Sequence, residues 1–229
     1  MRRVAEGARY AFKADPYSSH AVALAWLGEG GGRRLLDVGA ADGLLARPLT
    51  ARGWRVTAIE TDAAAAAAGA PHCERMLVAD LDREVPPLAE RFEAIVCGDV
   101  LEHLRDPGAV LAALTASLAP GGRVLVSVPN VAHLWIRLCL LAGRFEYADR
   151  GILDRTHLRF FTLRSLRALL DRAGLRVLRT TATPVPLYQV VPARYHWAAL
   201  AGVHAASAAA ARALPRLLGY QHVVLAARG

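Results

Sequence analysis

Lysine and cysteine are scarce in this sequence of 229 residues. Lys13 is the only lysine among 28 basic residues, so arginine carries nearly all of the positive charge. The three cysteines, Cys73, Cys97 and Cys139, lie far apart and form no Cys-x-x-Cys pair. This spacing excludes a disulfide scaffold and a zinc ribbon, and it predicts a protein of the reducing cytoplasm.

Long apolar runs of the kind that target or anchor a chain are also missing. The first residues contain no apolar stretch of about seven or more, which argues against a secretory signal. The Ala-rich stretch within residues 184–219 is interrupted by His204 and Arg212, so we do not expect it to span a membrane. Peripheral contact with a membrane stays open as an alternative to a purely cytoplasmic location.

The overall composition is that of a globular protein. Hydrophobic residues make up 54% and charged residues 21%, which excludes a disordered chain, a collagen-like repeat and a coiled coil. The length predicts one domain, residues 1–229, with an appendage. The formal net charge of +8 is spread along the chain and can reflect genomic base composition as well as a ligand. We therefore keep a nucleic-acid partner only as an alternative.

From Arg33 onward, short apolar runs alternate with helical patterns, which is the signature of βαβ units in a parallel sheet. We expect strands at residues 33–40, 54–60, 75–80, 92–99, 123–130, 175–183 and 221–228. We expect helices at residues 42–53, 61–69, 106–122 and 162–174. Thr162 would be the N-cap of the last of these helices, and Gly174 would end it. The predicted fold is a doubly wound α/β domain.

Two segments fall outside this alternation. Residues 1–30 contain one helical stretch that we expect to cover a site. Residues 184–219 are expected to form a helical insertion, or lid, between the last two strands. We predict that this insertion is a mobile cover whose apolar side contacts lipid. The expected lipid contacts are Trp197, Leu200 and Leu214.

The first strand runs into a turn of small residues that begins a helix. Asp37, Gly39, Ala41 and Gly43 alternate with other residues, and glycine at such a turn lets a ligand approach the backbone. The dinucleotide pattern Gly-x-Gly-x-x-Gly fails, because its second and third glycines would be Ala41 and Leu44. This mismatch argues against a dehydrogenase.

The turn resembles the first motif of the class I S-adenosylmethionine-dependent methyltransferases, acid-x-Gly-x-Gly-x-Gly, with Ala41 in place of the central glycine. The resemblance implies a Rossmann-like sheet of seven strands whose last strand is antiparallel. It also implies that an acid near Asp37 orients the cofactor's ammonium group, and that Glu60 binds the ribose hydroxyls. The cofactor positions that follow from it are Asp37, Gly39, Ala41, Gly43, Glu60, Thr61, Asp80, Leu81 and Asp99.

An acid and histidine cluster follows the fourth strand. If a helical turn begins there, Asp99, Glu102 and His103 lie at i, i+3 and i+4 and project from one face. Oxygen ligands with an imidazole suit Mg²⁺, Mn²⁺ or Zn²⁺. The alternative is that Glu102 and His103 pack near the methionine end of the cofactor, or cap the next segment, without a metal.

A second histidine, His157, lies in a polar and aromatic loop, residues 151–162, just before the amphipathic helix. The arrangement resembles the ubiquinone-pathway O-methyltransferases and the enzymes that methylate the 2′-hydroxyl at small-RNA 3′ ends. That resemblance implies a metal bound by Asp99, Glu102, His103 and His157, although the RNA enzymes have a longer Glu at the first position.

His133 follows the fifth strand and is a candidate substrate contact, general base or surface histidine. The catalytic candidates are thus His103, His133 and His157. Trp135, Leu138 and Cys139 lie in an apolar helical run after His133 and are expected to pack in the interior.

The expected reaction is methyl transfer from S-adenosylmethionine to a hydroxyl of a small molecule, a glycan or a lipid precursor, with metal assistance as an option. Three alternatives stay open: RNA 2′-O-methylation, small-molecule N-methylation, and a non-catalytic module that binds S-adenosylmethionine.

Overall fold

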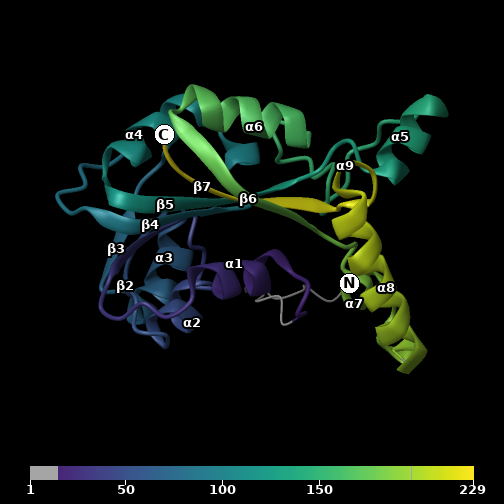
Figure 1. Ribbon diagram of the computed structural model, residues 1–229, viewed down its shortest axis with the longest axis horizontal. Helices are drawn as coiled ribbons and strands as arrows, with labels where there is room; N and C mark the ends of the chain where they lie inside the picture. The colour runs from purple at the N-terminus through teal and green to yellow at the C-terminus, as the bar shows by residue number, and fades with distance from the viewer. Residues whose placement is uncertain (1–14, 197) are drawn as a thin grey trace.

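The computed structural model describes residues 15–196 and 198–229 and has three layers (Figure 1). A twisted sheet of seven strands lies between two groups of helices. In Figure 1, α4 and α6 lie above the sheet, and α1, α2 and α3 lie below it. The helices α5, α7, α8 and α9 gather at one end of the molecule.

The sheet has the order β3-β2-β1-β4-β5-β7-β6. The first five strands pair in parallel, and β7 is antiparallel to both of its neighbours, β5 and β6. The strand bounds are β1 Arg34–Val38, β2 Arg55–Glu60, β3 Arg75–Val78, β4 Phe92–Gly98, β5 Leu118–Pro129, β6 Leu175–Thr183 and β7 Gln221–Arg228. The predicted doubly wound sheet with an antiparallel last strand is confirmed.

The helices cover both faces and one edge of this sheet. Their bounds are α1 Ser19–Leu27, α2 Ala46–Thr50, α3 Ala63–Gly69, α4 Pro107–Ala116, α5 Leu134–Leu141, α6 Leu163–Arg172, α7 Leu187–Val190, α8 Ala198–Ala213 and α9 Pro215–Leu218. Single 3-10 turns occur at Ala70–His72, Leu101–His103 and Ala193–Tyr195.

Two apolar clusters hold the layers together. Leucines of α6 at i, i+3, i+6 and i+7 pack with α4 on one face of the strands, which explains why this helix is so strongly amphipathic. The smaller helices α1 and α2 pack on the other face. The central strands β1, β4, β5 and β7 are largely buried on both faces, so their sequences are mostly apolar. The edge strands β3 and β6 are partly exposed.

Three sequence expectations need correction. The helix expected at 42–53 begins only at Ala46, because the small-residue turn extends through Leu45. The helix expected at 106–122 ends at Ala116, and residues 118–122 start β5 with a register shift opposite β4. Trp135 and Leu138 were expected to pack in the interior, but they are 66% and 49% exposed.

The segment between β6 and β7 is helical, as predicted, and contains α7, α8 and α9. Its helix α8 is fixed to the N-terminal side of the chain by a contact of 2.7 Å between His204 Nε2 and Asp15 Oδ2. Of its predicted lipid contacts, Leu214 is exposed, Leu200 is half-buried, and Trp197 lies outside the described residues. No helix in the described ranges combines the length and the hydrophobicity that a bilayer crossing requires.

Candidate active site at the carboxyl edge of the sheet

The loop after β1 is shaped by glycine. Gly39 has a φ of 71°, and a Cβ atom there would lie 2.9 Å from Cγ2 of Val100, so a larger residue would not fit without a shift. Gly43 also has a positive φ of 83°. Ala41, between them, adopts a φ of 48°, a conformation that alanine rarely takes. The loop therefore keeps the turn of a glycine-rich motif at a small cost in strain at Ala41.

Asp37 lies beneath this loop at the end of β1. Its side chain is 2% exposed, and its Oδ2 atom has no hydrogen-bond partner among the described residues. Burial, followed by the nearby carboxylate of Glu60, raises the pKa of Asp37 to about 7. A buried, unpaired carboxylate is costly unless a cation or a donor comes to it. The position therefore fits the ammonium group of an S-adenosylmethionine cofactor.

Glu60, at the tip of β2, holds the loop in place. Its Oε2 atom accepts a hydrogen bond from the backbone N–H of Ala41 at 2.7 Å. Its Oε1 atom accepts from the N–H groups of Thr61 and Asp62 at 2.8 and 2.9 Å. A carboxylate has about four acceptor positions, so acceptor capacity is left for a ribose hydroxyl. Glu60 thus has a structural role besides the ribose contact that the resemblance implies.

Asp80 and Leu81 follow β3 along the same edge. Asp80 Oδ1 accepts from the backbone N–H of Asp82 at 3.0 Å, and its Oδ2 lies 3.3 Å from Nε of Arg83. Leu81 is 9% exposed and packs on the core below. Asp80 therefore caps a turn and remains open to solvent at the predicted adenine position.

The predicted metal or base cluster is partly assembled. Glu102, His103 and His157 each place a potential ligand atom within 4.8 Å of the others. Glu102 and His157 are buried, at 1% and 9% exposure, and His103 is half-buried. The two imidazole rings are edge to face with centroids 4.9 Å apart. The loop of residues 151–162 thus delivers His157 to the turn that carries Glu102 and His103.

Backbone carbonyl groups orient both histidines. His157 Nδ1 lies 3.1 Å from the carbonyl oxygen of Ile152, and His103 Nδ1 lies 3.2 Å from that of Thr156. A carbonyl oxygen only accepts, so each Nδ1 is a donor and each Nε2 keeps its lone pair. Burial lowers the pKa of His157. An imidazole held through Nδ1 can offer Nε2 either to a divalent cation or, as a general base, to a proton.

Asp99 is not part of this three-residue group. It has a φ of 55°, and a 3-10 turn begins only at Leu101, so the helical spacing assumed for Asp99 does not form. Its carboxylate instead accepts the hydroxyl of Ser127 and the side-chain amide of Gln221, each at 2.7 Å. Asp99 still lies close enough to favour protonation of His157 electrostatically.

His133 is the N-cap of α5. Its Nδ1 atom accepts from the backbone N–H of Trp135 at 3.2 Å, and its ring centroid lies 6.4 Å from that of Tyr220. Burial lowers the pKa of His133. Because the cap uses the Nδ1 lone pair, Nε2 carries the proton, and His133 is poorly suited to be the general base.

Sequence reasoning missed the residues that hold Asp99. Ser127 is a polar residue within the otherwise apolar strand β5, and this break in the pattern was the available signal. Gln221 begins β7, 122 positions after Asp99, and no local pattern relates the two.

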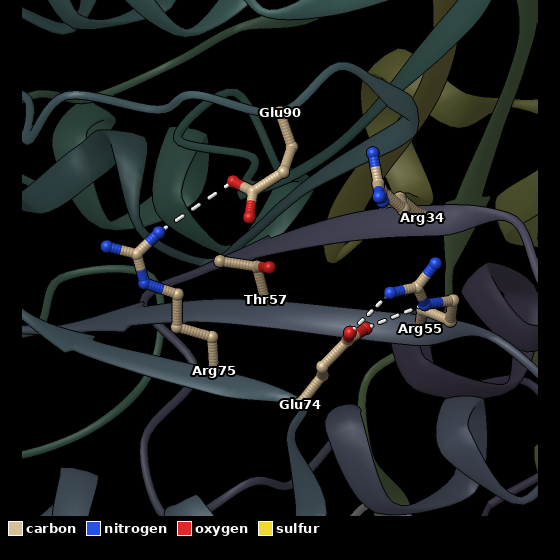
Figure 2. A pocket seen from close by; sticks show the side chains of 6 residues that line it. All are labelled: Arg34, Arg55, Thr57, Glu74, Arg75 and Glu90. Atoms are coloured by element: carbon tan, nitrogen blue, oxygen red, sulfur yellow. Dashed lines mark hydrogen bonds and ion pairs between the residues drawn. The ribbon is translucent and has the colours of Figure 1, made fainter.

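A cavity of about 220 Å³ lies at the opposite, amino-terminal edge of the sheet (Figure 2). Four of the five charged side chains that line it form two pairs: Arg55 with Glu74 at 2.5 Å, and Arg75 with Glu90 at 3.8 Å. These residues begin β2 and β3 or precede β4, so the cavity is separate from the glycine loop and the histidine cluster.

Comparison with protein families gives one domain match. Residues 9–180 match a family model described as a methyltransferase domain. The matched range contains the glycine loop, Glu60 and the histidine cluster.

Curated relatives match part of the chain. A ubiquinone biosynthesis O-methyltransferase from Alkalilimnicola ehrlichii is 39% identical over 105 residues, which cover 43% of this chain and 42% of that protein. A protein of the same name from Nitrobacter winogradskyi is 32% identical over 157 residues, covering 64% and 58% of the two chains. The matches thus span about half the length of these relatives.

A solved structure has the same fold. The magnesium protoporphyrin IX methyltransferase from Synechocystis, crystallised with bound SAH, superimposes with a TM-score of 0.61. The match covers 92% of this chain and 82% of that one, at 16% sequence identity. At this identity the likeness concerns the fold and not the substrate.

Proposed function

This chain belongs to the class I S-adenosylmethionine-dependent methyltransferases, and we propose that it methylates a hydroxyl group of a small molecule, a glycan or a lipid precursor. The observation that carries the proposal is the cluster of Glu102, His103 and His157. Its turn follows Val100, whose side chain lies against Gly39 of the glycine loop. A neutral hydroxyl is a weak nucleophile at pH 7, so O-methylation needs a base or a cation at this point. The names of the curated relatives agree with O-methylation.

We assign the cofactor to the loop between β1 and α2. Asp37 would neutralise the ammonium group, and Glu60 would accept a ribose hydroxyl. Asp80 and Leu81 would border the adenine, while Gly39, Ala41, Gly43 and Thr61 would line the loop. When bound, S-adenosylmethionine supplies the methyl group from its sulfonium.

The histidine cluster would prepare the acceptor. Glu102, His103 and His157 would hold a divalent cation, Mg²⁺, Mn²⁺ or Zn²⁺, which would lower the pKa of a coordinated hydroxyl. Without a cation, Nε2 of His157 accepts the hydroxyl proton, since its Nδ1 is already oriented by Ile152. The acceptor oxygen prepared by these residues would receive the methyl group that the sulfonium of the bound cofactor supplies. In both versions the residues would align the acceptor oxygen with the methyl carbon. Such positioning lowers the activation free energy by about several kcal/mol.

The substrate is best found with the purified chain, isotopically labelled S-adenosylmethionine and cell extract. Mass spectrometry of the products should reveal a labelled methyl group on oxygen. A label found only on nitrogen, or tight cofactor binding without any product, would contradict the proposal.

The metal is tested by chelation once a substrate is known. Activity should vanish with EDTA and return with Mg²⁺, Mn²⁺ or Zn²⁺, and His157→Ala should abolish turnover while cofactor affinity stays intact. Glu74→Ala is the control, because it changes an exposed side chain at the opposite edge of the sheet and should leave activity largely unchanged. Full activity of the metal-free enzyme would leave His157 or His103 as the general base.

A further inference from the structure

Exposed apolar side chains are concentrated at the end of the molecule that carries the site. Among the described residues, every large exposed hydrophobic side chain except Val78 and Leu178 lies within residues 134–158 or 188–214. Figure 1 draws α5 and α8, which belong to these two segments, at the same end of the molecule. Soluble monomers rarely leave so much apolar surface together, so this end is a candidate interaction surface.

The helix α5 presents the most apolar part of this surface. Its residue Ile136 is buried and packs with Ile152 and Leu153. The other side of the helix carries Trp135 and Leu141, which are 66% and 84% exposed. Ile136 is thus the buried apolar side chain of this helix, whereas its leucines and Trp135 are between 37% and 84% exposed.

The exposed surface is continuous with the histidine cluster through aromatic rings. The His157 ring centroid lies 6.3 Å from that of Phe160, which lies 5.8 Å from that of Phe145. Phe145 in turn lies 5.6 Å from Tyr147, and both are exposed. Aromatic rings therefore extend from the exposed surface to the histidine cluster, and an apolar part of a substrate would lie along them.

Charge indicates what covers the surface. Residues 131–161 and 184–219 together contain eight arginines against three carboxylates. Apolar side chains with tryptophan and arginine beside them are typical of segments that lie at the surface of an anionic bilayer. A second copy of this chain would bring arginines against arginines, so charge disfavours a symmetric dimer through this face.

We propose that α5, with Phe145 and Tyr147, docks on an anionic lipid bilayer and opens the site toward the membrane. The consequence for the substrate rests on the proposed function: the acceptor hydroxyl would belong to a lipid-anchored molecule. Docking itself does not depend on catalysis and can be measured without cofactor or turnover.

Vesicle co-sedimentation with the full chain tests the docking. The protein should pellet with phosphatidylglycerol vesicles at low salt, pellet much less with phosphatidylcholine vesicles, and be released as salt rises. Leu141→Glu should weaken binding by about tenfold or more, because it places a charge on the docking face. Leu178→Glu is the matched control, an exposed leucine outside both segments, and it should bind as the parent does.

Three results would overturn the proposal. The first is that the parent protein stays in the supernatant with anionic vesicles at low salt. The second is an equal effect of Leu141→Glu and Leu178→Glu. The third is a concentration-dependent dimer, found by sedimentation without vesicles, that Leu141→Glu dissociates. Cofactor affinity of each variant, measured by calorimetry, reports folding and tests the methyltransferase assignment separately.

Discussion

The buried carboxylate of Asp37 predicts that cofactor binding depends on pH. Its pKa is raised to about 7 in the free protein, so the folded chain binds this proton more tightly than the unfolded chain does. Ionising Asp37 therefore costs stability as the pH rises from near its ordinary value of 3.8 to about 7. The free protein favours the protonated form of Asp37. A bound cationic cofactor would instead favour the ionised carboxylate, because opposite charges attract.

We expect the affinity for S-adenosylmethionine to rise by up to about tenfold per pH unit between about pH 5 and pH 7, where binding releases the proton of Asp37. Calorimetry in two buffers of different ionisation enthalpy measures that proton release directly. Asp37→Asn should bind weakly at every pH and should lose the pH dependence. A pH-dependent affinity that persists in this variant would assign the effect to another group.

Glu60 gives a second prediction at the scale of one residue. Glu60→Ala should weaken S-adenosylmethionine binding by about 1.5–3 kcal/mol, because it removes a charge-assisted ribose contact and the bond that holds Ala41. Glu74→Ala, which removes an exposed carboxylate at the other edge of the sheet, is the matched control. Unchanged affinity in the Glu60 variant, or tight binding of NAD by the parent, would contradict the cofactor assignment.

The residues that sequence could place are those whose role is local. Asp37, Gly39 and Gly43 belong to one turn, and each strand end lies at the same edge of a parallel sheet, so their convergence follows from the pattern. Gln221 could not be placed in this way, because its contact with Asp99 depends on how β7 inserts beside β5. The prediction that Asp99 lies on one helical face with Glu102 and His103 was wrong. It assumed a helical turn at Asp99, where the backbone has a positive φ.

At the scale of elements, α6 connects the histidine loop to the core. Its start has a reciprocal cap: Thr162 accepts from the backbone N–H of Ser165, and Ser165 accepts from that of Thr162. The loop that carries His157 ends at this cap. Helix stability and the position of His157 should therefore change together.

Thr162→Ala should lower the free energy of unfolding by about 1 kcal/mol, the usual cost of losing a cap. Turnover should fall more than cofactor affinity does, because the cap supports the histidine loop and not the glycine loop. Urea denaturation and calorimetry measure the two effects. Thr162→Asn can still cap the helix, so this variant should keep both the free energy of unfolding and turnover near those of the parent. If it behaves like Thr162→Ala, the methyl group of Thr162 matters and the cap does not.

Periodicity predicted the strands better than the helices around the site. Strands buried on both faces are apolar throughout, and their limits follow from the residues that interrupt them. The helix α5 was misread because its leucines and Trp135 have the composition of a core segment while most of them face outward. An apolar helix face is expected to be buried against something. Its composition does not indicate whether it packs on the same chain or on a partner.

At the scale of the whole molecule, the contact between Asp15 and His204 joins the two segments that flank the sheet. His204 is 1% exposed, and its ring also makes edge contacts with Tyr17 and Tyr188, at centroid distances of 5.4 and 5.2 Å. The partners are 189 positions apart, so no sequence pattern predicts that the N-terminal side of the chain holds α8. This contact sets how firmly the insertion lies on the rest of the protein.

His204→Ala should cost about 2–4 kcal/mol of unfolding free energy, since it removes a buried hydrogen bond and leaves a cavity among aromatic rings. The loss should be local, so trypsin should cleave the variant faster at Arg194, an exposed residue of the insertion, than at Arg91 between β3 and β4. Equal acceleration at both arginines would mean that His204 supports the whole fold and not the insertion alone. Figure 1 draws α8 at the same end of the molecule as α5, the helix that we assign to the bilayer. We therefore expect the same variant to bind anionic vesicles more weakly as well. Its affinity for S-adenosylmethionine, which depends on the glycine loop, should stay near that of the parent.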